Sequence, residues 1–146
     1  MERIVQKTGR IREYLDQIQS MRQDCEKRFE TDPIYRGAML HYLYLLTDTC
    51  ITLAAMVIKQ KKLRLPQSYQ ESFDILGDNQ ILEPGFAHDF AKIAGFRNFL
   101  AHDYENVNKA IICRNILSQM EKISNYLEQI EKNLGLQRNN ENSFKK

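Results

Sequence analysis

The sequence predicts an all-α protein, an up-and-down bundle of four long helices and one short helix. Apolar residues recur at intervals of three and four over long stretches, which is the period of a helix. Only 3 prolines and 6 glycines are present to interrupt helices, and no segment is rich in β-forming residues. The 146 residues fit one domain, expected over residues 1–136, while the polar residues 137–146 are expected to form a disordered tail.

The first two helices are predicted from their patterns and from the residues between them. The first should run from Glu2 to Phe29, because its apolar residues share one face and charged residues fill the other. Asp32 can cap the next helix, and Pro33 suits its first position. This second helix should reach Lys62. It is apolar nearly all round, so we expect it at the centre of the bundle or against a second protomer.

The second helix ends in a group of basic residues, Lys59, Lys61, Lys62 and Arg64. One interpretation is a phosphate-binding patch. The other is a basic last turn that complements the negative end of the helix dipole. The second is favoured here because such endings are common.

A short helix and a third long helix follow. Ser68 and Glu71 have capping-box spacing and predict a helix over 68–76, which Gly77 should end. After a turn over 78–83, the third long helix is expected over 84–101.

The last helix should begin near Asn106 or Asn108 and end at Gly135. Its apolar seam is nearly heptad-like, which suits a bundle. The residues of this seam are Ile112, Ile116, Met120, Ile123, Leu127, Ile130 and Leu134.

Composition excludes several classes of protein. The net charge of +2 is too small to indicate nucleic-acid binding by overall field. Cys25, Cys50 and Cys113 have neither metal-site nor disulfide-framework spacing, and we expect buried free thiols in a reducing cytosol. The N-terminus lacks an apolar leader, and no run of about 18 apolar residues is uninterrupted. The expected location is therefore cytoplasmic, without membrane contact.

Reactive side chains gather at the end of the third long helix, where Arg97, Asn98, His102, Asp103 and Tyr104 stand within eight residues. Arginine offers a fixed charge and a planar fork for phosphate oxygens. Histidine exchanges protons near neutral pH, and a tyrosine phenol can donate, accept or be modified. This set predicts phosphate-ester chemistry that needs neither a metal nor another cofactor.

The spacing of these residues limits how they can meet. Asn98 and His102 share one helical face, whereas Arg97 and His102 stand about 140° apart around the helix. The latter two converge only if the helix ends or distorts near Ala101, or if a second chain completes the site. The competing interpretation is that the arginine and the histidine only cap carbonyls and hold a loop.

The order of residues from Arg97 to Tyr104 resembles the signature of the HepT-like branch of the HEPN superfamily. That signature is an arginine, a polar residue, three residues, a histidine, one residue and a tyrosine. The segment from Arg36 into a helix with Asp48 matches too, as does the turn at 66–69. The resemblance implies a helical, HEPN-like, dimeric fold. It also implies a metal-independent endoribonuclease that acts as a toxin and is paired with an MntA-like minimal nucleotidyltransferase antitoxin.

The resemblance also assigns roles to residues. It makes Arg97 and His102 the catalytic pair that cleaves RNA, with Asn98 in support. Tyr104 becomes the residue that the partner adenylylates to silence the enzyme. One histidine cannot be base and acid in the same step, so a homodimer, alone or in a larger hetero-oligomer, should bring both His102 side chains to one cleft.

Further cations and histidines complete the expectations. Arg36, Lys92 and Lys109 are candidates for a positively charged cleft that binds RNA. His41 is expected in the core and His88 on the surface. Neither histidine is expected to bind a metal. Two other functions stay open. One is a non-catalytic nucleotide- or RNA-binding module in a defence or regulatory complex, and the other is a structural adaptor.

Overall fold

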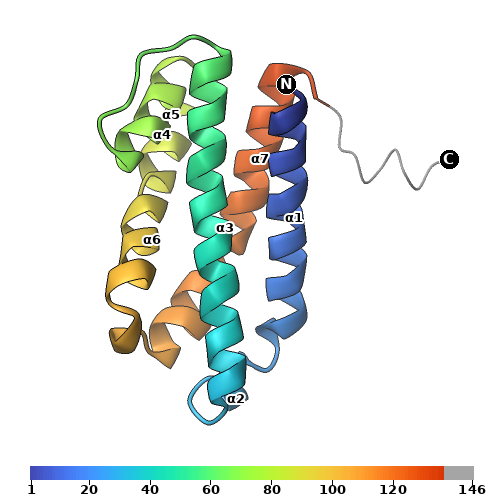
Figure 1. The fold of residues 1–146 in the computed structure, drawn as a ribbon, viewed down its shortest axis with the longest axis vertical. Coiled ribbons are helices and arrows are strands. Elements are labelled where there is room, and N and C mark those ends of the chain that lie inside the picture. Colours follow the sequence, from blue (N-terminus) through green and yellow to red (C-terminus); the bar gives the residue numbers. More distant parts are fainter. Residues whose placement is uncertain (137–146) are drawn as a thin grey trace, which may run out of the picture.

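The computed structural model describes residues 1–136, and these residues form helices, turns and loops without a strand. The predicted all-α bundle is thus confirmed, while the predicted tail over 137–146 lies outside the described residues. Helix α3 runs through the middle, with α1 on one side and α4 to α6 on the other (Figure 1). The helices are α1 (Glu2–Arg22), α2 (Cys25–Arg28), α3 (Pro33–Gln60), α4 (Tyr69–Asp78), α5 (Pro84–Phe90), α6 (Ile93–His102) and α7 (Met120–Leu134).

Helix α3 is the central element that its apolar sequence predicts. Asp32 caps it, since its carboxylate accepts hydrogen bonds from the amides of Ile34 and Tyr35 at 3.1 and 3.0 Å. By length and composition α3 could cross a membrane. Half of its most apolar window is buried inside the protein, as in the core helix of a bundle.

Helix α1 ends at Arg22, so the prediction that it continues to Phe29 is wrong. The Met21 carbonyl accepts hydrogen bonds from the Asp24 amide, three residues on, and from the Tyr35 hydroxyl of α3. This tertiary contact turns the chain before α2.

Helix α1 is also joined to α7, because Arg12 forms a bidentate ion pair with Glu131 at 2.6 and 2.7 Å.

Helix α4 begins with the predicted Ser68 cap, and the carboxylate of Glu71 bonds the residue before the cap rather than the cap itself. The Glu71 amide donates to Ser68 Oγ at 3.1 Å, and the Gln67 amide donates to the Glu71 carboxylate at 2.7 Å. Gly77 does not end this helix, contrary to the prediction, because α4 continues to Asp78. A Cβ on Gly77 would lie 2.7 Å from the Ala87 Cβ, so the missing side chain lets α4 and α5 approach closely.

The third and last long helices are both interrupted. The third is divided into α5 and α6 at residues 91–92. In the last, residues 110–116 form a π-helix and 117–119 a 3₁₀ turn before α7 begins. The segment begins near Asn108, one of the two predicted starts, where the Asn108 side chain accepts a hydrogen bond from the Ile111 amide. Gly135 ends α7 at φ 70°, as predicted. Of the four long helices that the periodicity predicts, three are therefore divided into shorter segments, and only α3 is continuous.

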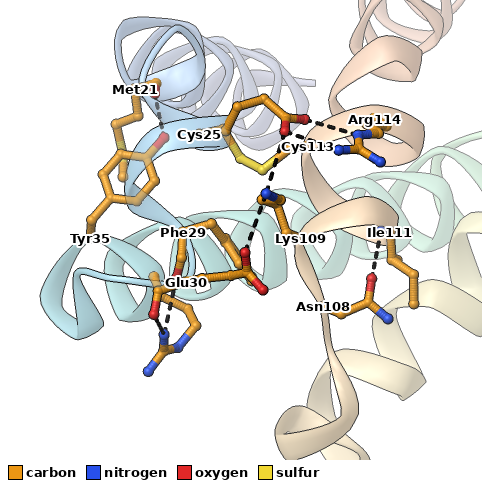
Figure 2. The surroundings of a disulfide bond; sticks show 12 residues. Met21, Cys25, Phe29, Glu30, Tyr35, Asn108, Lys109, Ile111, Cys113 and Arg114 are labelled. Carbon is orange, nitrogen blue, oxygen red and sulfur yellow. Dashed lines mark hydrogen bonds and ion pairs between the residues drawn. A yellow bond between two sulfur atoms is a disulfide. The ribbon is translucent and has the colours of Figure 1, made fainter.

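Cys25 and Cys113 form a disulfide, which corrects the prediction of three free thiols (Figure 2). The turn after α1 brings Cys25 to the π-helix, with a Cα–Cα distance of 5.6 Å. Glu26 joins the same two segments through Arg114 at 3.2 Å and Lys109 at 3.8 Å, and the Arg114 hydrogen bond lowers the pKa of Glu26. Cys50 alone matches the prediction: it is a free, buried thiol whose pKa is raised by burial.

Candidate functional site

Arg97 is held on the inner side of α6, against α3. Its Nε donates to Asp48 Oδ1 at 3.1 Å, and its Nη2 donates to the Tyr44 hydroxyl at 3.1 Å. Its Nη1 donates to Asn98 Oδ1 at 3.2 Å, so Asn98 does contact the arginine. The side chain is 18% exposed, so it is not sealed in the core.

Two tyrosines flank this guanidinium. The Arg97 Cζ lies 5.3 Å from the ring centroid of Tyr44 and 5.4 Å from that of Tyr69. Burial alone would lower the pKa of Arg97, but the Asp48 hydrogen bond and the nearby phenols raise it overall. The group therefore stays cationic. We refer to Arg97, Asp48, Tyr44 and Tyr69 as the arginine cluster.

The sequence analysis missed Tyr44 as a functional residue. Tyr44 and Asp48 are four residues apart in α3, so they share a helical face. This spacing was the only sign in the sequence that Tyr44 lies beside Asp48. Tyr69 comes from the start of α4, in the 66–69 turn that carries part of the family resemblance, but its position in the chain does not indicate a contact with Arg97.

His102 is the last residue of α6, and its side chain is exposed. Of the two conditions for the convergence of Arg97 and His102, an end or distortion of the helix near Ala101 does not apply, since α6 is regular through both residues and ends at His102. Arg97 and His102 therefore leave the helix about 140° apart. Within residues 1–136, no hydrogen bond or ion pair of the His102 side chain is found. One chain thus presents the two predicted catalytic groups separately, both accessible to solvent.

Tyr104 lies just after α6, in the 3₁₀ turn Tyr104–Asn106, and is 48% exposed. It lines a hollow of about 400 Å³ together with His41 and Tyr44. Gly37 also lines this hollow, and a Cβ there would lie 3.9 Å from the Tyr104 hydroxyl. His41 is exposed, so its predicted place in the core is wrong. Since Tyr44 also bonds Arg97, the Tyr104 hollow adjoins the arginine cluster.

The other expected cations have separate roles. Arg36 donates to the carbonyls of the α2–α3 turn, and Lys109 pairs with Glu30 at 3.2 Å. Both line a second hollow, of about 480 Å³, that reaches Tyr104. Lys92 pairs with Asp89 at 3.5 Å, and both line a groove next to α7. Thus Arg36 and Lys109 lie near Tyr104, but none of the three joins the arginine cluster.

Metal-ligating side chains do not converge in the part of the chain that the structure describes, where no group of three His, Cys, Asp or Glu could hold an ion. His88 is exposed, as predicted. The arrangement offers a fixed cation that can bind a phosphate, a free imidazole that can transfer a proton, and an accessible phenol.

Comparison with known proteins gives one family over most of the chain. The family model described as "Ribonuclease HepT-like" matches residues 11–130. A curated relative is the mRNA nuclease HepT of Shewanella oneidensis, which is 25% identical over 128 residues. That alignment covers 88% of this chain and 96% of the relative.

Solved structures agree with this match. A tri-AMPylated Shewanella oneidensis HEPN toxin in complex with an MNT antitoxin is 25% identical, with a TM-score of 0.79, and covers 88% of this chain and 96% of its own. A toxin–antitoxin crystal structure with AMP-PNP is 23% identical and has a TM-score of 0.81, covering 90% and 99%. The cytosolic protein YutE of Bacillus subtilis shares the fold at 18% identity and a TM-score of 0.67, covering 86% and 89%.

Proposed function

The chain belongs to the ribonuclease HepT-like family of the HEPN superfamily, and from this we propose that it is a metal-independent endoribonuclease, the toxin of a toxin–antitoxin pair. The observation that carries the proposal is the arginine cluster. Arg97 is oriented by Asp48 and two tyrosines, and remains partly open five residues before an exposed His102. A buried strut would need neither the opening nor the free imidazole.

Cleavage of RNA without a metal uses the substrate's own 2′-hydroxyl as nucleophile. The enzyme must remove its proton, stabilise the charged phosphorane and protonate the leaving 5′-oxygen. In the proposal Arg97 stabilises the phosphorane, and His102 transfers the protons. Asn98 supports Arg97 through their hydrogen bond at 3.2 Å.

A homodimer supplies the second histidine. Because Arg97 and His102 diverge on α6, one pocket that holds both requires a second copy of the chain. Of the 28 residues of α3, 12 are buried within the chain, so the dimer surface is narrower than its all-round apolar sequence suggests. An exposed strip of α3 remains beside the Tyr104 hollow. It includes Ile34, which is 85% exposed, and His41.

Adenylylation of Tyr104 by a partner nucleotidyltransferase would silence this site. The Tyr104 hydroxyl is accessible and faces a hollow that adjoins the arginine cluster. An AMP group adds negative charge and bulk, and so competes with an RNA phosphate for Arg97. The AMPylated toxin from Shewanella oneidensis, found in complex with its antitoxin, supports this assignment. With an RNA substrate and a nucleotidyltransferase antitoxin as partners, the protein is expected in the cytoplasm.

The test is expression followed by an RNA cleavage assay in the presence of a metal chelator. We expect the native chain to arrest growth and to cleave RNA. The variants His102→Ala and Arg97→Ala should each lose activity by about 10²–10⁴-fold, the usual contribution of such groups. Tyr104→Phe should cleave RNA but gain no AMP mass when co-expressed with a nucleotidyltransferase.

The alternatives give different results in the same assay. RNA binding by the native chain without cleavage would indicate the non-catalytic module. If His102→Ala lowers the melting temperature and the native chain neither binds nor cleaves RNA, the motif is structural.

A further inference from the structure

A groove leads away from the arginine cluster between α3 and the segment that enters α4. Its volume is about 340 Å³. On the α3 side it is lined by Asp48, Thr52 and Ala55, and on the other side by residues 66–69. Asp48 is already paired with Arg97, and the remaining lining is neutral. The groove therefore contains no unpaired carboxylate.

Three lysines follow the last α3 residue that lines this groove, beginning one helical turn beyond Ala55, although none of them lines it. Asp48, Thr52, Ala55 and Lys59 succeed one another at steps of four, three and four, so they share one face of α3. The path from Asp48 to Lys59 is about 16 Å at 1.5 Å per residue. Lys61 and Lys62 follow at once. All three lysines are exposed, and none forms an ion pair with another of residues 1–136.

Only one of these lysines lies within the last turn of α3. Helix α3 ends at Gln60, so Lys59 alone lies in its last turn. Lys61 and Lys62 lie beyond the helix, and Arg64 is paired with Glu71 at 3.2 Å. The interpretation favoured from the sequence, a basic ending that complements the dipole, suits Lys59 and the C-cap residue Lys61, and all three lysines stay exposed.

Tyr69 stands at the near end of the groove and is 49% exposed. Its ring contacts the Arg97 guanidinium at 5.4 Å and lines the groove. It also lines a second hollow, of about 410 Å³, which includes Gly95 and Asn98 of α6. An accessible aromatic ring therefore lies between two hollows, directly beside the candidate catalytic arginine.

We propose that this groove binds the RNA strand on one side of the scissile phosphate, with Tyr69 stacking on a base and Lys59, Lys61 and Lys62 contacting phosphates. Single-stranded nucleic acid is bound by this combination of a cationic track and an aromatic platform. The local cations also explain how a chain of net charge +2 can hold RNA. The inference rests on the proposed function, because it extends the same site.

The experiment measures binding of a fluorescent 12-nucleotide RNA by anisotropy. Its 2′-O-methyl groups remove the nucleophile, so the native chain cannot cleave it. Tyr69→Ala should weaken binding about tenfold, the scale of one lost base stack, and Tyr69→Phe should bind like the native chain. The triple variant Lys59→Gln/Lys61→Gln/Lys62→Gln should reduce the slope of log K against log salt by about 2.

A second triple variant controls for net charge. Arg10→Gln/Arg22→Gln/Lys132→Gln removes three exposed cations from α1 and α7, across α3 from α4 (Figure 1). We expect it to change affinity less than twofold. If both triple variants lose RNA affinity equally, the effect is one of overall charge, and the proposal is overturned.

Other outcomes separate this proposal from the proposed function. If the native chain cleaves RNA but Tyr69→Ala and the lysine variant bind RNA normally, the groove is not the RNA site, while the ribonuclease stands. If these variants instead lose affinity for a nucleotidyltransferase alone, the groove binds protein, and the proposal is wrong. If the native chain binds RNA through these residues without cleaving it, the groove stands and the ribonuclease does not.

Discussion

At the scale of single residues, the site depends on how Arg97 is fixed. A guanidinium on a flexible stem loses side-chain entropy whenever it is oriented. Here Asp48, Tyr44 and Asn98 fix it before any ligand arrives, at distances of 3.1 to 3.2 Å. A pre-oriented cation can stabilise a charged transition state without reorganising.

Asp48 should therefore act as a positioning residue. Asp48→Asn keeps the size of the side chain but removes its charge, and we expect RNA cleavage to fall about tenfold because Arg97 is less firmly held. Steady-state kinetics on a defined RNA would measure this, with Asp74→Asn, at an exposed position of α4, as the control. Unchanged cleavage in the Asp48 variant would show that the other partners suffice.

The local motif carries only part of this site. Arg97, Asn98, His102 and Tyr104 are visible in the sequence because they lie within eight residues and their chemistry is distinctive. Tyr44 and Tyr69 could not be found in the same way, since packing of α3 and α4 against α6 brings them to Arg97. The divergence of Arg97 and His102, in contrast, follows from helical geometry alone.

At the scale of helices, starts were easier to predict than ends. Asp32, Ser68 and Asn108 cap as expected because capping needs only side chains close in sequence. The early end of α1 could not be predicted, since it depends on a hydrogen bond from the distant Tyr35. The π-helical winding of 110–116 shifts the buried face from Ile112 to Leu117, five residues on, so the predicted seam residue Ile116 is only half-buried. The three-and-four spacing of the sequence does not reveal this shift.

The close contact of α4 with α5 makes Gly77 sensitive to substitution. Gly77→Ala should lower the free energy of unfolding by about 1–3 kcal/mol, because the new Cβ meets Ala87 and the backbone of Pro84. Urea denaturation would measure this change. Gly95→Ala is a matched control in α6: its Cβ would meet nothing within 4 Å, so helix propensity should leave it neutral or slightly stabilised. Equal stability of the two variants would contradict the close contact.

At the scale of the whole molecule, two links join segments far apart in the chain. Arg12 and Glu131 connect α1 to α7 through largely buried side chains, 12% and 7% exposed. The disulfide connects α2 to the π-helix across 88 residues. Spacing alone did not predict this bond, because it depends on the turn that separates α1 from α2. A reducing cytosol keeps most thiols reduced. The disulfide therefore stabilises the fold only in molecules in which these two cysteines are oxidised.

Removing the disulfide should lower stability markedly. A cross-link that closes so long a loop restricts the unfolded chain, and its loss should cost about 2–4 kcal/mol of unfolding free energy. Urea denaturation of the oxidised chain with and without dithiothreitol would measure the difference. Cys25→Ser/Cys113→Ser should match the reduced chain and be insensitive to the reductant. An unchanged midpoint on reduction would contradict a stabilising bond.

The same disulfide also divides the oxidised chain mechanically. Residues 25–113 form a covalent ring that contains α3 and the whole segment from Arg97 to Tyr104, whereas α1 and α7 belong to two open arms. Tension applied at either terminus straightens an arm only as far as a cysteine, where the sulfur–sulfur bond carries the load to the opposite arm. The arms can be drawn out fully while the ring, and every residue that we assign to chemistry, stays unextended.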